Sequence, residues 1–180
     1  IEREIYVGEF GGAGEFGHTI IHTNGYDCHC GQKGCFEVYA SGKFLEIEGE
    51  RQMKLFPDSI LKGKKLNFDS VYEAAKRGDQ LAKNLFKHLG ENLGIGLINV
   101  INSFNPSTII LIGEGMIAKD FFLESAINKA NENFFNKVNY HTEIVVSELG
   151  NDAWLQGAAL LAINQLFQPP IYEKTNSILR

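Results

Sequence analysis

Three cysteines, all that this 180-residue chain contains, fall within eight positions, at Cys28, Cys30 and Cys35. His18 stands ten residues upstream of the first, and glycines at 31 and 34 lie between the last two. Glycine lets a chain turn sharply enough for several side chains to converge on one point. One histidine and three thiolates are the ligand set of a closed tetrahedral zinc site. The pattern therefore predicts a structural Zn²⁺ that orders the loop over residues 18–37.

Alternatives to this zinc site stay open. Three cysteines cannot all pair within one chain, so an oxidised loop would leave an odd thiol, and a loop of free thiols is also possible. His22 and His29 are rival histidines for the fourth ligand, although His29 lies between two ligating cysteines. Four protein ligands leave no open coordination position, so the expected metal is structural rather than catalytic.

Composition favours one compact domain, because 44% of the residues are apolar and 180 residues can bury a sizeable core. The net charge of −5 argues against contact of this segment with DNA, which attracts basic surfaces. No apolar run reaches the roughly 18 residues that a membrane span needs. We recognise no signal peptide, and metal-binding thiols suit a reducing compartment, so we expect a cytoplasmic protein without membrane partners.

Hydrophobic periodicity and turn residues predict an α/β fold of alternating strands and helices. A capping box at Ser70–Glu73 predicts a helix start, and Asp79 is expected to cap one long helix reaching Phe104. Three glycines in that helix indicate a close neighbour, for which the adjoining sheet is the expected candidate. The expected strands cover Glu4–Val7, His18–Thr23, Thr108–Ile112 (fully buried) and Glu143–Ser147. Further helices are expected to begin near Phe36, to cover Ala118–Val138, and to cover Asp152–Phe167, where Pro169-Pro170 ends the last one. Residues 42–67 are expected to contain an irregular or helical stretch.

Several sequence blocks together resemble the ROK family of bacterial sugar kinases and sugar-responsive transcriptional repressors. The first is G-E-F-G-H at Gly14–His18, followed by C-x-C-G-x-x-G-C-x-E at Cys28–Glu37 and by Ser41-Gly42. Later blocks are L-G-I-G-L-I-N-V-I-N-S-F-N-P at Leu93–Pro106, the I-I-L-I-G run after it, and Gln156–Ala159. The resemblance covers almost the whole chain, from about Ile5 to about Pro170.

The resemblance implies a fold and a set of site residues. The fold is the second lobe of an actin-like, ribonuclease H-like two-lobed protein, a mixed sheet flanked by helices, here over residues 1–170 with a tail at 171–180. The family's zinc ligands fall on His18, Cys28, Cys30 and Cys35, and its sugar-binding residues fall on Glu15, His18 and Glu37. This is chemically sensible, because carboxylates accept strong hydrogen bonds from sugar hydroxyls and a metal fixes the tautomer of an imidazole.

Family members that phosphorylate sugars carry a D-x-G-x-T phosphate loop and a catalytic aspartate in the first lobe, and this chain contains neither. The repressors carry a helix-turn-helix ahead of that lobe, which is also missing here. We therefore expect the chain to be a piece of a longer protein, with an N-terminal lobe as partner and DNA bound only through the absent helix-turn-helix. Family resemblance and the apolar faces of an isolated lobe also indicate a homo-oligomer.

The turn Gly113-Glu114-Gly115 favours the repressor branch of the family. It follows a strand, where α/β proteins accept nucleotides, and it resembles a G-G-G turn in the kinases. Glu114 replaces the middle glycine, and a carboxylate there would repel a triphosphate. We therefore expect no catalytic residue in this chain and a sugar-effector domain of a repressor. The alternative is the C-terminal half of a glucokinase- or fructokinase-like enzyme that uses ATP and Mg²⁺; a free-standing zinc-binding interaction module has less support.

Overall fold

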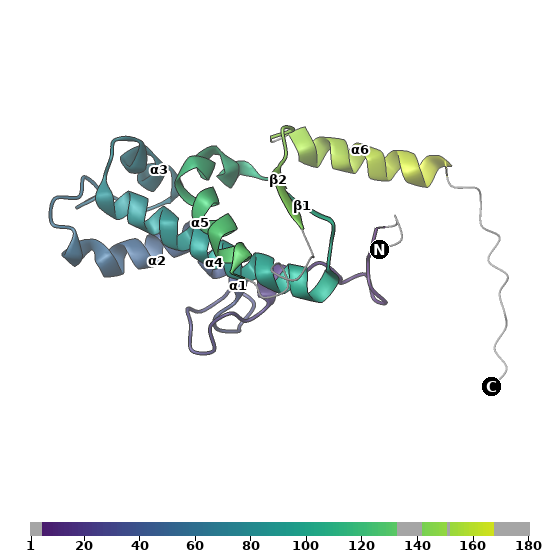
Figure 1. Cartoon of the computed structure of the whole chain (residues 1–180), viewed down its shortest axis with the longest axis horizontal. Helices are drawn as coiled ribbons and strands as arrows, with labels where there is room; N and C mark the ends of the chain where they lie inside the picture. The colour runs from purple at the N-terminus through teal and green to yellow at the C-terminus, as the bar shows by residue number, and fades with distance from the viewer. Residues whose placement is uncertain (1–4, 133–141, 151, 168–180) are drawn as a thin grey trace.

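Helices make up most of the computed structural model, which describes residues 5–132, 142–150 and 152–167 (Figure 1). The short helices are η1 (Phe16–His18), α1 (Phe36–Tyr39), η2 (Met53–Leu55) and η3 (Glu114–Ala118). The longer ones are α2 (Gly42–Gln52), α3 (Phe68–Lys76), α4 (Gln80–Phe104), α5 (Lys119–Asn131) and α6 (Asp152–Phe167). Strands β1 (Thr108–Leu111) and β2 (Glu143–Val146) lie between the helical body and α6.

Helix α4 is the centre of the helical body and contacts α1, α2, α3 and α5. Its first turn is capped by Asp79, whose carboxylate accepts a hydrogen bond from the backbone N–H of Ala82 at 2.9 Å. Its last residue is Phe104, and the C-cap Asn105 adopts a left-handed conformation (φ 43°) that asparagine tolerates better than most residues. Leu81, Leu85 and Phe86 from this helix are fully buried. The predicted single long helix is therefore confirmed.

The glycines of α4 permit close contact with α5 rather than with the sheet. A Cβ atom at Gly90 would lie 2.2 Å from the carbonyl oxygen of Phe122, and one at Gly94 would lie 2.4 Å from the Cβ of Lys129. A third glycine, Gly96, faces the ring of Phe36 at the start of α1. The expected close neighbour exists, but the expectation that it is the sheet was wrong, because α5 covers this face.

Helix α3 begins earlier than the sequence predicted. The capping residue is Asn67, whose side chain accepts the N–H of Ser70 at 2.8 Å, while the Ser70 hydroxyl accepts the N–H of Asn67 at 3.0 Å. Ser70 therefore closes a capping box rather than opening one. The earlier start places Phe68 on the helix, where its ring packs edge-on against Phe86 at 5.8 Å. Within 42–67, the expected irregular helical stretch consists of α2 followed by η2.

The sheet of the described residues is parallel and has two strands, with Thr108 opposite Glu143 and Leu111 opposite Val146. Helix α5 supplies the crossover between them, as parallel strands require. The prediction that β1 is fully buried was wrong, since Ile110 is 61% exposed. A strand with one neighbour leaves its other edge and part of its faces uncovered. The mixed sheet that the family resemblance implied is not seen within the described ranges.

The two N-terminal strands predicted from the sequence do not form in the described residues. Residues 5–7 carry no strand, and Glu4 lies outside the described ranges. In the segment 18–23, η1 ends at His18, and Ile20 forms one isolated bridge with Cys35 instead of a ladder. The helix predicted over Ala118–Val138 begins as η3 and continues as α5 to Asn131. Its last predicted residues, the Pro169-Pro170 stop and the 171–180 tail lie outside the described residues.

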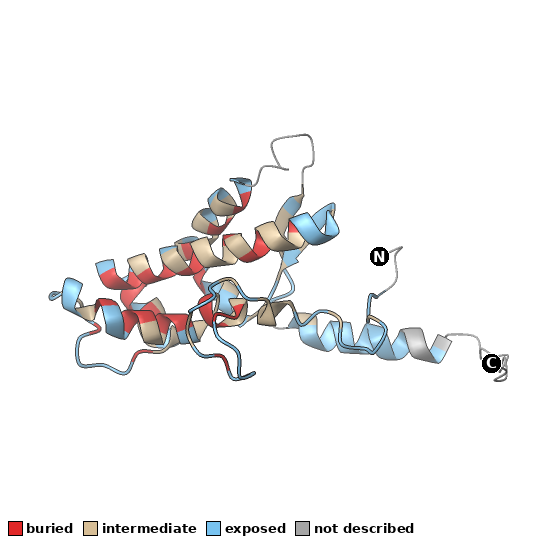
Figure 2. Ribbon diagram, turned by 90° about the horizontal axis from the view of Figure 1, so that it is seen from below, coloured by how far each residue is buried: buried red, intermediate tan, exposed pale blue. Residues whose placement is uncertain are grey.

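Burial divides the molecule into two parts (Figure 2). The core lies among α1 to α5, and it includes Leu45, Leu61, Val71 and Leu85. Helix α6 lies apart from this core, and its described residues other than Ala153 are exposed. Its apolar residues, such as Trp154 and Leu155, therefore remain uncovered in this chain.

Candidate metal centre and adjoining carboxylates

The loop between η1 and α1 is shaped by hydrogen bonds between its outgoing and returning limbs. The N–H of Ile21 donates to the carbonyl of Gly34 at 2.9 Å, and the N–H of Cys28 donates to the carbonyl of Gln32 at 2.9 Å. Gly34 adopts φ +79°, and a Cβ there would lie 1.6 Å from the carbonyl oxygen of His22. Only glycine fits that position. The loop therefore returns tightly enough to bring its cysteines together.

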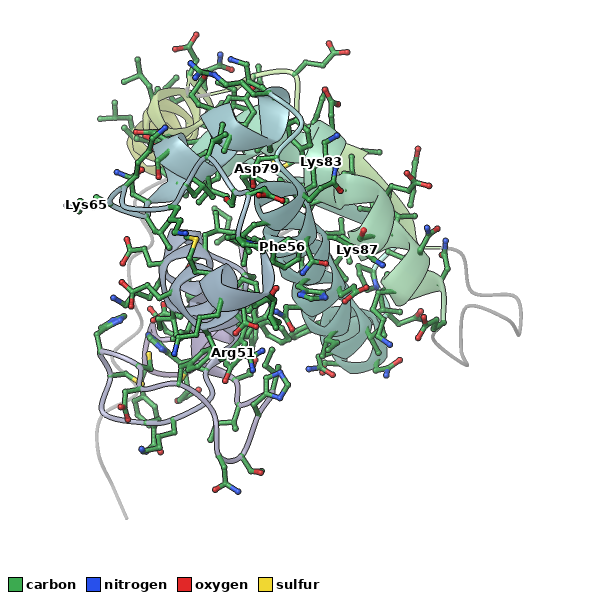
Figure 3. All side chains as sticks on the ribbon, turned by 90° about the vertical axis from the view of Figure 1, so that its left-hand side faces the viewer. Arg51, Phe56, Lys65, Asp79, Lys83 and Lys87 are labelled. Carbon is green, nitrogen blue, oxygen red and sulfur yellow. The ribbon has the colours of Figure 1, made fainter. Side chains whose placement is uncertain are left out.

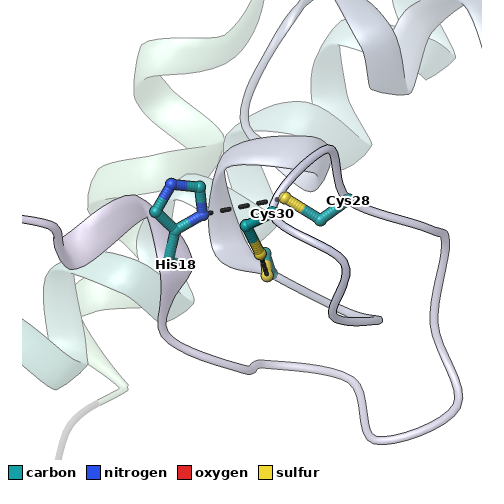
Figure 4. A group of neighbouring side chains, drawn as sticks. His18, Cys28 and Cys30 are labelled. Carbon is teal, nitrogen blue, oxygen red and sulfur yellow. Dashed lines mark hydrogen bonds between the residues drawn. The ribbon is translucent and has the colours of Figure 1, made fainter.

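The structure brings the four predicted metal ligands into one cluster (Figure 4). Their donor atoms, on His18, Cys28, Cys30 and Cys35, all lie within 4.8 Å of one another. The His18 Nδ1 is 3.7 Å from the Cys28 Sγ, and the Sγ atoms of Cys30 and Cys35 are 3.6 Å apart. Ligands about 2.3 Å from a tetrahedral zinc are separated from one another by roughly 3.7 Å. The donor types and these two separations therefore fit zinc.

The rival histidines occupy other positions. The His22 ring packs against the ring of Tyr39, with centroids 4.4 Å apart. The Nδ1 of His29 is 2.9 Å from Oε1 of Glu37 but 3.9 Å from the Cys28 sulfur. His29 also groups with His18 and Glu37 as a second possible set of metal ligands, but that set lacks the thiolates. The four-atom cluster favours His18 over both rivals.

Without a metal, the environment of the loop keeps protons on two of the thiols. The backbone at Cys30 lowers the pKa of Cys28, but the hydrogen bond to Glu37 and burial together raise it to about 12. Burial raises the pKa of Cys35, whereas the backbone of Gln32 lowers that of Cys30. Metal ligation requires thiolates, so metal binding here must displace protons and should strengthen as pH rises.

Two carboxylates flank His18, one on each ring nitrogen. Oε2 of Glu15 lies 3.8 Å from Nε2, and Oε1 of Glu37 lies 3.8 Å from Nδ1. Glu37 is held in the first turn of α1, while Glu15 precedes η1 and is largely exposed. The three predicted sugar-binding residues therefore lie together beside the cysteine cluster. The Nδ1 of His18 faces the Cys28 sulfur, and its Nε2 faces the largely exposed Glu15.

A buried acidic network adjoins the loop, and sequence patterns did not reveal it. Glu48 on α2 is 5% exposed and binds the Tyr26 hydroxyl, 2.5 Å away, the Gln52 amide, and the Arg51 guanidinium. Figure 3 shows Arg51 where the cysteine loop meets the helical body. The spacing of Glu48, Arg51 and Gln52 along one helix could have predicted the contacts among these three side chains. The sequence could not have predicted the contact with Tyr26, which lies 22 residues from Glu48.

Substituting Glu48 by glutamine should remove a pH-dependent part of the stability. Hydrogen bonds from Arg51, Gln52 and Tyr26 outweigh burial and lower the pKa of Glu48 from 4.5 to about 2. A lowered folded-state pKa stabilises the protein above pH 4.5, and this contribution disappears as pH falls toward 2. We expect the Glu48→Gln variant to lose about 3 kcal/mol at pH 7, with the gap to wild type narrowing below pH 4.5. Urea unfolding across this pH range measures the gap, and a gap independent of pH would contradict the assignment.

The turn Gly113-Glu114-Gly115 lines a cavity of about 1290 Å³ at the carboxyl ends of both strands. Gly113 has φ +122° and leads into η3, which begins at Glu114. The charged residues of the lining are Asp69, Glu114, Glu148 and Lys119. Three carboxylates against one ammonium make this an unfavourable place for a triphosphate without bound cations.

Among the described residues, no helix is both long and apolar enough to cross a membrane.

Comparison with known proteins assigns the family. The model of the ROK family matches residues 1–165. The chain belongs to the ROK family. Curated relatives include the xylose repressor of Bacillus subtilis, 31% identical over 164 residues, which cover 91% of this chain and 40% of that repressor. The DNA-binding transcriptional repressor Mlc of Escherichia coli is 29% identical over 82% of this chain and 36% of its own length. This ROK chain thus spans about two fifths of the length of these relatives.

Solved structures of the ROK family show the same fold. A ROK family glucokinase from Streptomyces griseus, in complex with glucose and AMPPNP, matches with a TM-score of 0.81 and 29% identity over 91% of this chain and 55% of its own. A ROK family transcriptional regulator, a homologue of Escherichia coli Mlc, matches with a TM-score of 0.73 and 31% identity over 88% of this chain and 40% of its own. The fold is therefore that of ROK sugar kinases and regulators alike.

Proposed function

We propose that this chain is the sugar-effector lobe of a ROK-family transcriptional repressor. The observation that carries the proposal is the convergence of Glu15, His18 and Glu37 beside the cysteine cluster. Carboxylates that flank an imidazole offer acceptors and a donor to neighbouring sugar hydroxyls. The similarity to the xylose repressor supports a sugar as the small-molecule partner, as does that to an N-acetylglucosamine repressor of Escherichia coli, 29% identical over 87% of this chain and 39% of its own length. Such a repressor acts on chromosomal DNA, which together with three cysteines that form no disulfide supports a cytoplasmic location.

We further propose that His18, Cys28, Cys30 and Cys35 hold a structural Zn²⁺. The metal would draw Nδ1 of His18 toward the cysteines and leave Nε2 for a sugar hydroxyl. It would also order a loop that has few buried apolar side chains of its own, Cys28 and Cys35 apart. Zinc therefore supports the sugar site indirectly, by fixing the orientation of one of its residues.

Calorimetry on the full-length protein tests the sugar site. Xylose, glucose and N-acetylglucosamine should be titrated separately, because relatives or their solved complexes carry these names. We expect binding of at least one of them, and loss of that binding in a variant that lacks Glu15 and Glu37. Absence of binding by all three and by a wider panel of monosaccharides would refute the effector role.

Replacing Glu37 by glutamine separates the sugar role from the metal role. Its carboxylate accepts stronger hydrogen bonds than an amide does, and a lost charge-assisted bond costs about 1.5–3 kcal/mol. We expect sugar affinity to fall ten- to a hundredfold while the zinc content stays at the wild-type value. Replacing the partly exposed Glu46 on α2 in the same way is the matched control. Unchanged sugar affinity in the Glu37→Gln variant would leave that residue a structural role only.

The exposed apolar surface supports a missing N-terminal lobe as partner. It comprises residues on β1 and α6, namely Ile110, Trp154, Leu155, Leu160 and Leu166. Apolar patches of this kind mark interaction surfaces, and the xylose repressor of Bacillus subtilis is more than twice as long as the chain. In the proposed mechanism, sugar binding closes the lobes, and this closure shifts an N-terminal helix-turn-helix between DNA-binding states. The same surface, left uncovered, would drive self-association into a homo-oligomer.

A second candidate function is the C-terminal half of an ATP-dependent sugar kinase. The match to the glucokinase that binds glucose and AMPPNP, and the cavity at the strand ends, favour it. The acidic lining around Glu114 weighs against it. Incubating the full-length protein with ATP, Mg²⁺ and each sugar distinguishes the two. Formation of sugar phosphate would support the kinase and refute the repressor proposal, whereas a helix-turn-helix in the N-terminal sequence would support the repressor.

A further inference from the structure

Tyr26 connects both limbs of the cysteine loop to the helical body. Its backbone N–H donates to the Tyr39 hydroxyl at 2.8 Å, and its carbonyl accepts the N–H of Gly34 at 2.8 Å. Its ring stacks on that of Tyr39, with centroids 5.2 Å apart and planes 19° from parallel. Cys28 follows only two residues later. The position of this cysteine therefore depends on where Tyr26 is held.

The hydroxyl of Tyr26 reaches a carboxylate that the helices have already buried. It donates to Oε2 of Glu48 at 2.5 Å, and Gln52 donates to Oε1 of the same carboxylate at 2.6 Å. Gln52 in turn accepts the side-chain amide of Asn84 on α4 at 2.8 Å. The chain of bonds thus runs from the loop through α2 to α4. A buried carboxylate is stable only while its hydrogen bonds are made, so opening the loop would leave Glu48 short of one donor.

We propose that Tyr26 is a positioning residue for the metal and sugar site, and that its bond to Glu48 holds the cysteine loop in its metal-binding shape before the metal arrives. The inference rests on the proposed zinc site, and it assigns the buried Glu48 network a role in that site. Preorganisation lowers the cost of ordering the loop when metal binds. If the loop were anchored only by its backbone hydrogen bonds, part of the free energy of metal binding would be needed to order it, and the metal affinity would be lower.

The test compares zinc affinity in the full-length protein and in its Tyr26→Phe, Glu48→Gln and doubly substituted forms. The matched control is Tyr72→Phe, which removes a hydroxyl from α3, outside the loop. Competition with a chromophoric chelator gives the zinc dissociation constant, and Co²⁺ substitution reports the ligand geometry by absorption. We expect each single substitution to weaken zinc about tenfold, as one charge-assisted hydrogen bond implies. The double substitution should weaken zinc no further than Tyr26→Phe alone, because Glu48→Gln only weakens the bond that Tyr26→Phe removes.

A purely structural role predicts different results. Tyr26→Phe would then lower the thermal midpoint equally with and without zinc, and its zinc dissociation constant and Co²⁺ spectrum would match those of Tyr72→Phe. That outcome overturns the inference, as would single-variant losses that multiply in the double variant. If Tyr26→Phe does not fold, Glu48→Gln tests the same bond from its other end. Absence of zinc in the wild-type protein would refute the proposed metal site and this inference together, whereas equal zinc binding by all variants would refute this inference alone.

Discussion

Replacing Cys30 by serine is expected to strip the metal from the protein and release the loop over residues 18–37. Serine is a poor zinc ligand, and losing one thiolate dismantles a closed four-ligand site. Structural zinc contributes on the order of 10 kcal/mol in small metal domains, so the local effect should be large. Elemental mass spectrometry should find one zinc per wild-type chain and none in the variant. Sugar binding should be lost with it, because His18 would no longer be held.

Two histidine substitutions serve as controls for this prediction. His18→Asn should lose zinc as Cys30→Ser does, whereas His29→Asn should retain it, because the His29 ring nitrogen faces Glu37 instead of the sulfurs. Zinc retained at full stoichiometry in Cys30→Ser would refute the ligand assignment. If wild-type protein carries no zinc, the cysteines serve redox chemistry or packing. The sugar-site proposal would then lose the group that orients His18.

Short-range patterns predicted the parts of this molecule that depend on neighbours in sequence. The long helix α4 follows from its apolar spacing and the Asp79 cap. The ligand cluster follows from cysteines and glycines that are close along the chain, so the loop had little freedom to place them elsewhere. Both features depend on contacts spanning few residues or on one periodicity.

Other features depend on partners far away in sequence, and patterns could not supply them. Apolar residues predicted that β1 is buried, yet full burial requires strands on both sides and a layer on each face. Residues of α4 and α5 pack against one face of the sheet, but the described chain places no further strand beside β1. A tyrosine in a polar loop gives no sign that a carboxylate 22 residues later will bind it. Similarly, the glycines of α4 indicated close packing, but only the fold shows that α5 is the partner.

Gly90→Ala is expected to be among the most destabilising single substitutions in the helical body. The added Cβ would lie 2.2 Å from the carbonyl oxygen of Phe122 and 3.0 Å from the Cβ of Ser125, so α4 and α5 must separate. Alanine improves helix propensity by about 1 kcal/mol, but forced overpacking against a backbone atom costs about 3 kcal/mol or more. The net loss should appear as a lower midpoint of urea unfolding at a nearly unchanged slope.

The matched control is Gly157→Ala on α6, where the new Cβ meets no atom within 4 Å. In this 180-residue chain it should be neutral or stabilising by up to about 1 kcal/mol, because only the helix propensity changes. Changes of opposite sign in the free energy of unfolding of the two variants would separate the effect of close packing from that of helix propensity. If Gly90→Ala proved as stable as wild type, α4 and α5 would have to lie farther apart than their contact shows.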